Sequence, residues 1–263
     1  MSSEFFIGSH QCDCSTWDTN YFGIKCGRIV LNGTLNSNDL RDIAEWVQAV
    51  DFVTIYNIAN DPLNNLMLCQ SQLRPFLADV NIKFCRFLAK LDADQQFSRF
   101  FISIESMSEL DEGIVSVATT CFTHSRFYND PNIPVEKARG VYAHWVSTAF
   151  NRSDRFFVKA KINGMTMGFI LFTLNKSEST CVVELIGVNP QASGLGIGST
   201  LLNQLALHTR GIGITKIKVG TQANNTKAVR FYEQNGFSYD GCTSVFHVWA
   251  KNIMDPYCHH QRC

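Results

Sequence analysis

The sequence lacks a long hydrophobic run and any excess of charge of one sign. Its longest mostly apolar stretch, residues 165–174, is far shorter than the roughly 20 residues that a membrane-spanning helix needs. Basic and acidic residues number 23 each, so the net charge is zero, which disfavours a dedicated nucleic-acid-binding protein. Residues 1–15 contain no basic segment followed by an apolar one, hence no secretory signal is recognised. We therefore expect a soluble cytoplasmic protein that binds neither nucleic acid nor a membrane.

Internal repeats and low-complexity tracts are not recognised either, and the 45% of hydrophobic residues is enough for a real core. The zero net charge conceals an asymmetry between the two halves. Residues 1–150 carry 11 basic and 17 acidic side chains (11 − 17 = −6), whereas residues 151–263 carry 12 and 6 (12 − 6 = +6). A phosphate-bearing ligand is therefore better sought in the second half.

The ten cysteines are interpreted as reduced thiols, because no secretory signal accompanies them. Two clusters of potential metal ligands occur near the ends of the chain: Cys12 and Cys14, and Cys258, His259, His260 and Cys263. Their spacing differs from the paired spacings of common structural zinc sites. We expect no metal.

The first part of the chain has the pattern of a small α/β domain. Strands are predicted at residues 24–31, 52–58 and 82–88, and residues 62–78 are predicted to be mostly helical. Another helix is predicted from the spacing of Leu40, Ile43, Ala44 and Val47, with Ser37, Asn38 or Asp39 as its cap. The polar stretch 92–98 is the expected linker. It divides the chain into an N-terminal domain, residues 1–95, and a C-terminal domain, residues 96–263.

The C-terminal domain is predicted to alternate helices and strands. Helices are expected at residues 110–122, through 142–149 and at 226–234, and strands at 156–162, 165–174, 181–188, 214–220, 237–239 and 244–249. Asn163-Gly164 predicts a type I′ hairpin turn, because both central residues of that turn need a positive φ. A further helix, with Ile197, Leu201 and Leu205 on one face, follows a glycine-rich loop.

That loop contains Gly194, Gly196 and Gly198 between a strand and a helix. Glycines there let the backbone approach an anion, and the helix N-terminus adds N–H donors and positive potential. The loop is not a P-loop, since no Lys-Ser/Thr follows, and the Rossmann spacing is absent. Taken alone, the glycines are equally typical of a connecting turn.

The loop resembles the pyrophosphate-binding loop of the GNAT superfamily of N-acetyltransferases, where V-x-P precedes [QR]-x-x-G-x-[GA]. Val188 and Pro190 match its first part and Gly196 and Gly198 its glycines, while Ser193 replaces the usual Arg or Gln. Residues 219–237 are similar to a second segment of the superfamily, N-x-x-A-x-x-x-Y-x-x-x-G-F, which is matched by Asn225, Ala228, Tyr232, Gly236 and Phe237.

The resemblance implies a mixed α/β protein: a C-terminal GNAT fold with a central mixed sheet, preceded by the smaller N-terminal α/β domain. It implies acetyl-CoA as the acetyl donor and direct attack of a primary amine on the thioester. Backbone N–H groups, where the strand ending at Val188 parts from its neighbour, would hold the acetyl carbonyl. The residues expected to bind the cofactor are Ile186, Val188, Ser193, Gly194, Leu195, Gly196, Ile197, Gly198, Ser199, Asn225 and Tyr232.

Two residues are expected to be catalytic. By the resemblance, Tyr232 donates to the departing thiolate; full proton transfer from a phenol to a thiolate is uphill by about 2 kcal/mol, so we expect a strong hydrogen bond. Glu184, on the strand before the loop, is the candidate base, with a surface carboxylate as the alternative interpretation. His124 and His144 are alternative bases.

The acceptor is expected to be a small-molecule primary amine. Arg126 and Tyr128 are the candidate substrate-binding residues, because an arginine fork suits a phosphate, although a structural ion pair is equally typical. Short blocks at 17–23, 125–131, 142–145 and 221–222 resemble superfamily members that acetylate amino-sugar nucleotides. Another amine as acceptor, a non-catalytic acyl-CoA-binding module and a homodimer all remain open.

Overall fold

The computed structural model describes residues 5–89, 101–105 and 109–253, and the chain divides into two compact units. The N-terminal unit comprises residues 1–81, 126–133 and 241–263, and the C-terminal unit comprises residues 82–125 and 134–240. These units do not coincide with the expected contiguous domains 1–95 and 96–263. The reason is that β5 (Phe76–Phe87) and β11 (Ser238–Trp249) each begin in one unit and end in the other.

The N-terminal unit is a mixed sheet with helices on its faces. Besides its parts of β5 and β11, it contains β1 (Phe5–Ile7), β2 (His10–Cys14), α1 (Thr16–Phe22), β3 (Cys26–Leu31), α2 (Ser37–Val47), β4 (Phe52–Asn57), α3 (Pro62–Gln70) and the 3-10 turn η2 (Ala250–Asn252). The strand order is β1-β2-β3-β4-β11-β5. Strands β3 and β4 are parallel and α2 joins them, whereas β11 runs antiparallel to β4.

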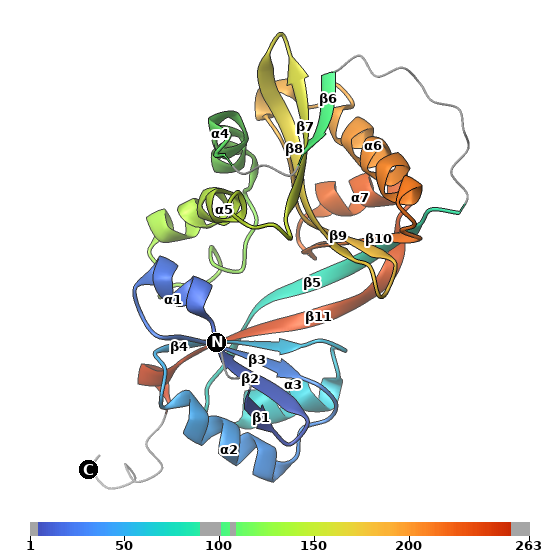
Figure 1. Ribbon diagram of the computed structural model, residues 1–263. Helices are drawn as coiled ribbons and strands as arrows, with labels where there is room; N and C mark the ends of the chain where they lie inside the picture. The colour runs from blue at the N-terminus through green and yellow to red at the C-terminus, as the bar shows by residue number, and fades with distance from the viewer. Residues whose placement is uncertain (1–4, 90–100, 106–108, 254–263) are drawn as a thin grey trace, which may run out of the picture. The chain divides into compact units, whose positions relative to one another are not determined.

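The two faces of this sheet differ in chemistry. Helices α2 and α3 lie on one face of this sheet (Figure 1), where Val53, Ile55, Phe246 and Val248 pack against their apolar side chains. The alternate residues of β4 and β11, among them Phe52, Thr54 and His247, point to the other face, because side chains alternate along a strand. Phe22 of α1 and Phe127 of the inserted segment 126–133 contact each other there, with ring centroids 5.3 Å apart.

In the C-terminal unit, the strand order of the sheet is β5-β10-β9-β8-β7-β6. Its remaining elements are β6 (Phe101–Glu105), α4 (Glu112–Cys121), α5 (Val135–Ala149), β7 (Phe156–Ile162), β8 (Met165–Asn175), β9 (Thr180–Val188), η1 (Pro190–Ala192), α6 (Ile197–Gly211), β10 (Lys216–Gln222) and α7 (Thr226–Gln234). Only β9 and β10 are parallel among its described pairs with a printed register, and α6 connects them. The fold class is therefore mixed α/β, as predicted.

Helices cover both faces of the C-terminal sheet (Figure 1). One core packs α6 and Tyr232 of α7 against Ile170, Phe172 and Val183. The other packs α4 and α5 against Phe169, Leu171 and Leu185. The opposite placement of Val183 and Leu185 on one strand is unusual, because residues two apart normally share a face.

Two predictions about secondary structure need correction. The helix expected within residues 62–78 is shorter than that range: α3 ends at Gln70, and Ser71 is extended. Pro75 disfavours a helical conformation for the residue before it, and β5 starts at Phe76. The two short strands expected at 237–239 and 244–249 are one strand, β11, which accommodates Gly241 at a φ of +110°. Strands β1, β2 and β6 and helix α1 were not anticipated.

Other predictions are confirmed. Asn163 and Gly164 both have positive φ, +50° and +81°, as the type I′ turn requires. Helix α2 occurs as expected, but Asn36 is its cap, while Asp39 completes the capping box. The expected linker 92–98 and the cluster Cys258–Cys263 lie outside the described residues.

Within the described ranges, no group of three or more His, Cys, Asp or Glu side chains is placed to hold a metal ion. Cys12 and Cys14 lie on β2, the first buried and the second exposed. None of the described helices is long and apolar enough to cross a membrane.

Candidate active site

A β-bulge interrupts β9 at Glu184. Leu171 of β8 lies opposite Leu185, but the next residue, Phe172, lies opposite Val183, so Glu184 is the extra residue of the bulge. The bulge changes which face the later residues of β9 point to, which explains why Val183 and Leu185 belong to different cores. The bulge thus redirects side chains immediately before the glycine-rich loop.

The parallel pairing of β9 with β10 ends at this bulge. The ladder runs from Thr180 opposite Lys216 to Val183 opposite Val219, while β9 continues to pair with β8 as far as Val188. Beyond Val183, every second backbone N–H of β9 therefore points away from β8 and is not used in the ladder with β10. Ile186 and Val188 lie in this parted stretch.

The loop after β9 leads into a helix N-terminus that no side chain caps. Asn189 caps the short turn η1 by accepting from Gln191 N at 2.9 Å. Gly194 and Gly196 both have a φ of +81°, a conformation that non-glycine residues rarely adopt. Gly196 is the N-cap of α6, and no side chain there accepts a hydrogen bond from the first turn. The first N–H groups of α6 are thus available to an anion.

The residues expected around this loop have different roles. Ser193 and Leu195 are exposed, and Ser199 is partly exposed on the first turn of α6. Ile197 is buried in the core, so it offers a ligand only its backbone. A Cβ on Gly198 would lie 3.0 Å from the Phe231 ring, so glycine there allows α7 to pack closely on α6.

Tyr232 of α7 is buried in the same core. Its ring lies 5.6 Å from the Phe84 ring and 5.7 Å from the Phe237 ring. Burial raises the pKa of the Tyr232 phenol, which keeps it protonated. In the described part of the chain, its hydroxyl has no hydrogen-bond partner. It is therefore a neutral donor that is free for a ligand.

Asn225 has a structural role that the sequence analysis did not assign. It is the N-cap of α7, and its Oδ1 accepts from Ala228 N at 3.2 Å. Only its Nδ2 donor remains for a ligand. The N-cap preference of asparagine was the signal for this role.

Both carboxylate oxygens of Glu184 are engaged. Arg155 Nε lies 2.8 Å from Oε1, and Trp145 Nε1 donates to Oε2 at 3.2 Å. The side chains of Glu184 and Arg155 are only 12% and 19% exposed, so this ion pair is partly shielded from solvent. Neither partner was anticipated for Glu184.

Cys121, at the end of α4, is another neighbour of the parted strand. A Cβ on Gly187 would lie 2.6 Å from Cys121 Sγ, so the thiol packs directly on the β9 backbone. Burial raises the pKa of Cys121 to about 12, so the thiol is neutral and a poor nucleophile. No pattern in the sequence indicates where this thiol lies.

The remaining candidates lie elsewhere. His124 Nδ1 is 3.1 Å from Thr123 Oγ1 in an exposed contact. For His144 on α5, burial and the neighbouring Lys137 charge lower the pKa. Arg126 and Tyr128 belong to the N-terminal unit, whereas the loop, Tyr232 and Glu184 belong to the C-terminal unit.

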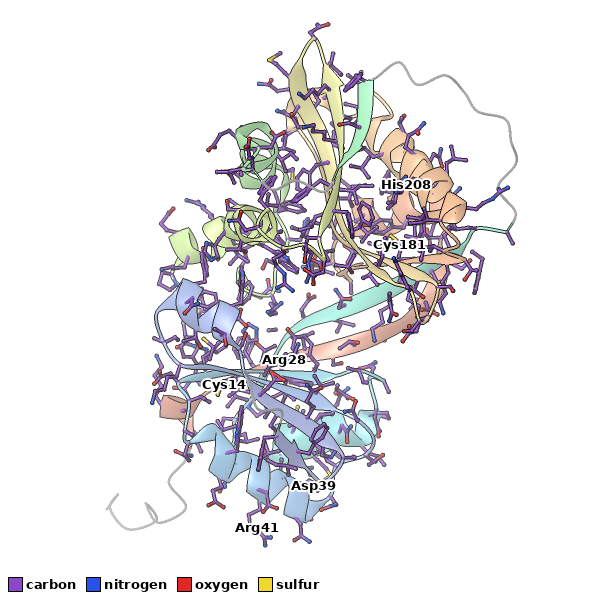
Figure 2. All side chains as sticks on the ribbon, in the orientation of Figure 1. Cys14, Arg28, Asp39, Arg41, Cys181 and His208 are labelled. Carbon is purple, nitrogen blue, oxygen red and sulfur yellow. The ribbon has the colours of Figure 1, made fainter. Side chains whose placement is uncertain are left out.

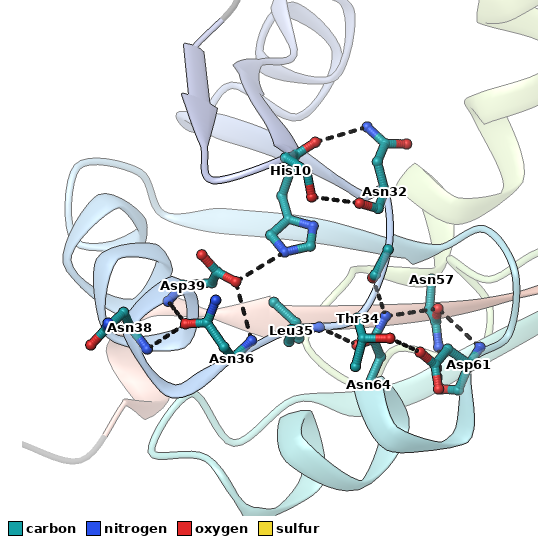
Figure 3. Close-up of polar contacts among 12 residues, drawn as sticks. His10, Asn32, Thr34, Leu35, Asn36, Asn38, Asp39, Asn57, Asp61 and Asn64 are labelled. Atoms are coloured by element: carbon teal, nitrogen blue, oxygen red, sulfur yellow. Dashed lines mark hydrogen bonds and ion pairs between the residues drawn. The ribbon is translucent and has the colours of Figure 1, made fainter.

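The N-terminal unit has its own parallel pair, β3 and β4, joined by a helix, but that helix N-terminus is closed (Figure 3). Asn36 Oδ1 accepts from Asn38 N at 2.8 Å and from Asp39 N at 3.0 Å. Asp39 Oδ2 accepts from Asn36 N at 3.1 Å and lies 3.4 Å from His10 Nε2. A capped N-terminus with a carboxylate in its first turn repels an anion. The open arrangement is therefore that of α6.

This combination defines a class of site: a bulged strand, a parted parallel pair and an uncapped helix N-terminus, suited to a phosphate-bearing ligand with a carbonyl group. Residues 118–237 match the model of the acetyltransferase (GNAT) family. The match includes the bulge, the glycine loop and Tyr232. This stretch, just under half of the chain, is therefore similar to acetyltransferases of the GNAT family.

A curated relative matches about half of this chain. The spore coat polysaccharide biosynthesis protein SpsD of Bacillus subtilis is 28% identical over 138 residues, which are 52% of this chain and 47% of SpsD. The chain thus matches about half the length of that relative.

Two solved structures share the fold. A GCN5-related N-acetyltransferase from Sphaerobacter thermophilus has a TM-score of 0.62 at 15% identity, over 92% of this chain and 76% of that one. A tandem GNAT protein from the clavulanic acid biosynthesis pathway has a TM-score of 0.60 at 13% identity, over 94% and 85%. The GNAT fold therefore accounts for most of the chain, including much of the N-terminal unit.

Proposed function

We propose that the protein is an acetyl-CoA-dependent N-acetyltransferase that acetylates a primary amine by direct attack on the thioester. The observation that carries the proposal is the uncapped N-terminus of α6, with Gly194 and Gly196 in the left-handed conformation directly after β9. The family match of the same residues supports it.

The residues present fit this cosubstrate. The backbone N–H groups from Gly194 to Ser199 would bind the pyrophosphate, and a Cβ at Gly194 or Gly196 would meet no atom within 4 Å, so the space beside them is open. Ser193 adds no long side chain, so the backbone provides the donors. The parted N–H groups near Ile186 and Val188 would hold the acetyl carbonyl. Acetyl-CoA itself supplies the acetyl group and a thiol leaving group.

Tyr232 is the proposed donor to the leaving thiolate. Its burial raises the pKa above that of an ordinary phenol, so transfer of the proton to a thiolate, whose conjugate acid has a pKa near 8.5, is unfavourable. Tyr232 therefore acts by donating a hydrogen bond that stabilises the developing charge. Asn225, seven residues before Tyr232 and therefore on the same side of α7, offers its Nδ2 to the same arm of the cosubstrate.

Glu184 is the proposed acceptor of the amine proton, through a water molecule. Its location on the bulge of β9, next to the parted strand, supports the role. Glu184 also forms an ion pair with Arg155, whose Nε lies 2.8 Å from Oε1. A second function for the same pair is to hold the bulge in place, and variants of the two residues separate the two functions.

The acceptor is proposed to be an amino-sugar nucleotide. SpsD is named for polysaccharide biosynthesis, which supports a sugar. The short sequence blocks around residues 17–23 and 125–131 resemble the bacterial dTDP-fucosamine acetyltransferase, which supports a nucleotide-linked amine. Arg126 and Tyr128, within the second block, are the proposed acceptor-binding residues.

The test is mass spectrometry of the products formed from acetyl-CoA and a panel of amines that includes dTDP-4-amino-4,6-dideoxygalactose. A thiol-reactive dye is unsuitable, because the ten protein cysteines would react with it. We expect acetylation of an amino-sugar nucleotide. If only other amines are acetylated, the protein is an N-acetyltransferase whose acceptor is not an amino-sugar nucleotide. If acetyl-CoA binds but no amine is acetylated, a non-catalytic binding module is favoured.

A further inference from the structure

One face of the N-terminal sheet contains buried polar atoms without partners. Thr54 of β4 lies directly opposite His247 of β11, so their side chains share a face. Thr54 Oγ1 and His247 Nε2 are both buried and have no hydrogen-bond partner among the described residues, and the same holds for Arg126 Nε. Buried polar atoms in native proteins are nearly always hydrogen-bonded, so three such atoms together require an explanation.

The three residues belong to one cluster. Arg126 Cζ lies 5.8 Å from the ring centroid of Tyr56, whose side chain is on the same face of β4 as Thr54. Arg126 also lies over the Phe127 ring, with Cζ 4.1 Å from its centroid. The Phe127 ring in turn lies 6.0 Å from the His247 ring. Arg126 and His247 thus flank the same aromatic ring.

Arg126 is a cation without an anion. Within the part of the chain that the structure covers, its guanidinium group forms no ion pair and no hydrogen bond, and it contacts the aromatic rings of Tyr56 and Phe127. The structural ion pair considered as the alternative in the sequence analysis is therefore not found among these residues. A partly buried guanidinium next to aromatic rings favours a planar oxyanion, because its fork donates two parallel hydrogen bonds.

The nearby acid, Asp130, already has its own partners. Its Oδ2 accepts from His247 Nδ1 at 2.8 Å and from Trp249 Nε1 at 2.9 Å, and its Oδ1 accepts from Asn132 N at 2.9 Å. Although burial raises the pKa of Asp130, these bonds outweigh it and lower the pKa, so the carboxylate stays charged. Asp130 therefore orients His247 rather than neutralising Arg126.

His247 consequently presents a hydrogen-bond acceptor. Burial lowers its pKa, so the ring is neutral, and the proton on Nδ1 is donated to Asp130. The lone pair of Nε2 remains. Thr54 Oγ1 can both donate and accept, so a ligand hydroxyl could bond to the two side chains at once. The cluster thus offers a cationic fork, a hydroxyl site and the ring of Tyr56 for stacking.

We propose that Thr54, Tyr56, Arg126 and His247 form a binding site for a ligand that carries an oxyanion and a nearby hydroxyl. Arg126 binds the oxyanion, and Thr54 and His247 bind the hydroxyl. The identification of the oxyanion as a phosphate of the acceptor rests on the proposed function. The site itself does not, because its evidence lies within the N-terminal unit.

The test is isothermal titration calorimetry of the full chain with two probes, thymidine diphosphate for a phosphate and glucuronate for a carboxylate. Titrations with and without saturating coenzyme A separate this site from the α6 loop, which thymidine diphosphate also suits. Arg126→Ala is expected to weaken binding of thymidine diphosphate at the coenzyme-insensitive site by at least about tenfold, since a charge-assisted bond is lost. Thr54→Val, of nearly equal size, is expected to weaken it several-fold.

Arg41→Ala is the matched control. Arg41 lies on α2 in the same unit, and its side chain is 70% exposed (Figure 2). This variant should bind the probes as the wild type does. If Arg126→Ala fails to fold, Arg126→Lys replaces it, because it keeps the charge but removes the fork, and it should weaken binding in the same direction.

Three results decide the inference. Binding of glucuronate alone, lost in the Arg126 variant, supports the site and makes its ligand a carboxylate. Equal binding by wild type and Arg126→Ala, or no saturable binding of either probe, overturns it. A failure of the proposed function looks different: no amine is acetylated, yet the Arg126-dependent binding is still measured.

Discussion

Arg155 Nε lies 2.8 Å from Glu184 Oε1, and Arg155 directly precedes β7. The extra residue of the β9 bulge therefore forms an ion pair with the residue before β7. This pairing fixes the carboxylate where β9 and β10 part. It gives Glu184 two roles that variants can separate, proton acceptor and anchor of the bulge.

Glu184→Gln tests the first role. Glutamine keeps an oxygen that can accept from Trp145 Nε1 but cannot take a proton. We expect kcat to fall by about 100-fold or more, as for loss of a general base, with a KM for acetyl-CoA close to that of the wild type. Steady-state kinetics with mass-spectrometric detection gives both constants.

Arg155→Lys is its control, because it keeps a cation near Glu184 but removes the fork. It should change kcat far less than Glu184→Gln does. If the two variants lose kcat equally and lose thermal stability equally, the pair is an anchor and Glu184 is not the base.

Tyr232→Phe removes one hydroxyl from a buried ring. Because that hydroxyl has no partner in the described part of the chain, the free energy of unfolding should stay within about 0.5 kcal/mol of the wild-type value. If Tyr232 donates to the thiolate, kcat should fall by about 10- to 100-fold, and acetyl-CoA affinity should change little. Calorimetry and single-turnover kinetics measure the two effects.

Tyr142→Phe is the matched control for this variant. Tyr142 is also a buried tyrosine of the C-terminal unit, but its hydroxyl donates to His124 O at 2.9 Å. Its loss should cost about 1 kcal/mol of stability and leave kcat unchanged. Full activity of Tyr232→Phe would remove the role assigned to Tyr232.

Gly196→Asp should abolish coenzyme A binding without unfolding the protein. Aspartate is a good N-cap, so its carboxylate would satisfy the free N–H groups of α6 and occupy the place of the pyrophosphate. Gly164→Asp has the same φ of +81° in a hairpin turn and serves as the control for backbone strain. Calorimetric titration with coenzyme A should show binding only in the control. Unchanged affinity of Gly196→Asp would refute the assignment of the loop.

Local chemistry made part of this site predictable. The turn at Asn163 and Gly164, the start of α6 after Gly196 and the course of α7 all depend on residues next to each other in sequence. These signals correctly predicted that a helix starts after the glycine-rich loop and that Tyr232 lies on a helix. They also predicted most strands that alternate apolar and polar residues.

The rest depends on partners far away in sequence. The bulge at Glu184 exists only relative to the register of β8, which no pattern within β9 reveals. The joining of residues 126–133 to the N-terminal unit depends on contacts such as Asp130 with His247, which are 117 positions apart. For that reason Arg126 was recognised as a candidate, but its surroundings were not.

The buried pair of Asp130 and His247 predicts how stability depends on pH. Burial lowers the pKa of His247 in the folded protein, and the charge of Arg126 lowers it further, against the opposing effects of Asp130 and Asp18. Below about pH 6.5 the unfolded chain therefore binds a proton that the folded chain does not. The free energy of unfolding should fall as pH decreases from there, by up to about 1.4 kcal/mol per pH unit. Asp130, whose folded pKa is also lowered, adds a loss of the same sign below about pH 3.9.

His247→Gln should flatten this dependence between pH 6.5 and the onset of acid unfolding, because glutamine does not titrate. Urea unfolding at pH 7.5, 6.5 and 5.5, compared with wild type, measures the slope of each variant. Equal slopes for wild type and His247→Gln would mean that the ring binds protons equally in the folded and unfolded states, so that burial does not keep it neutral.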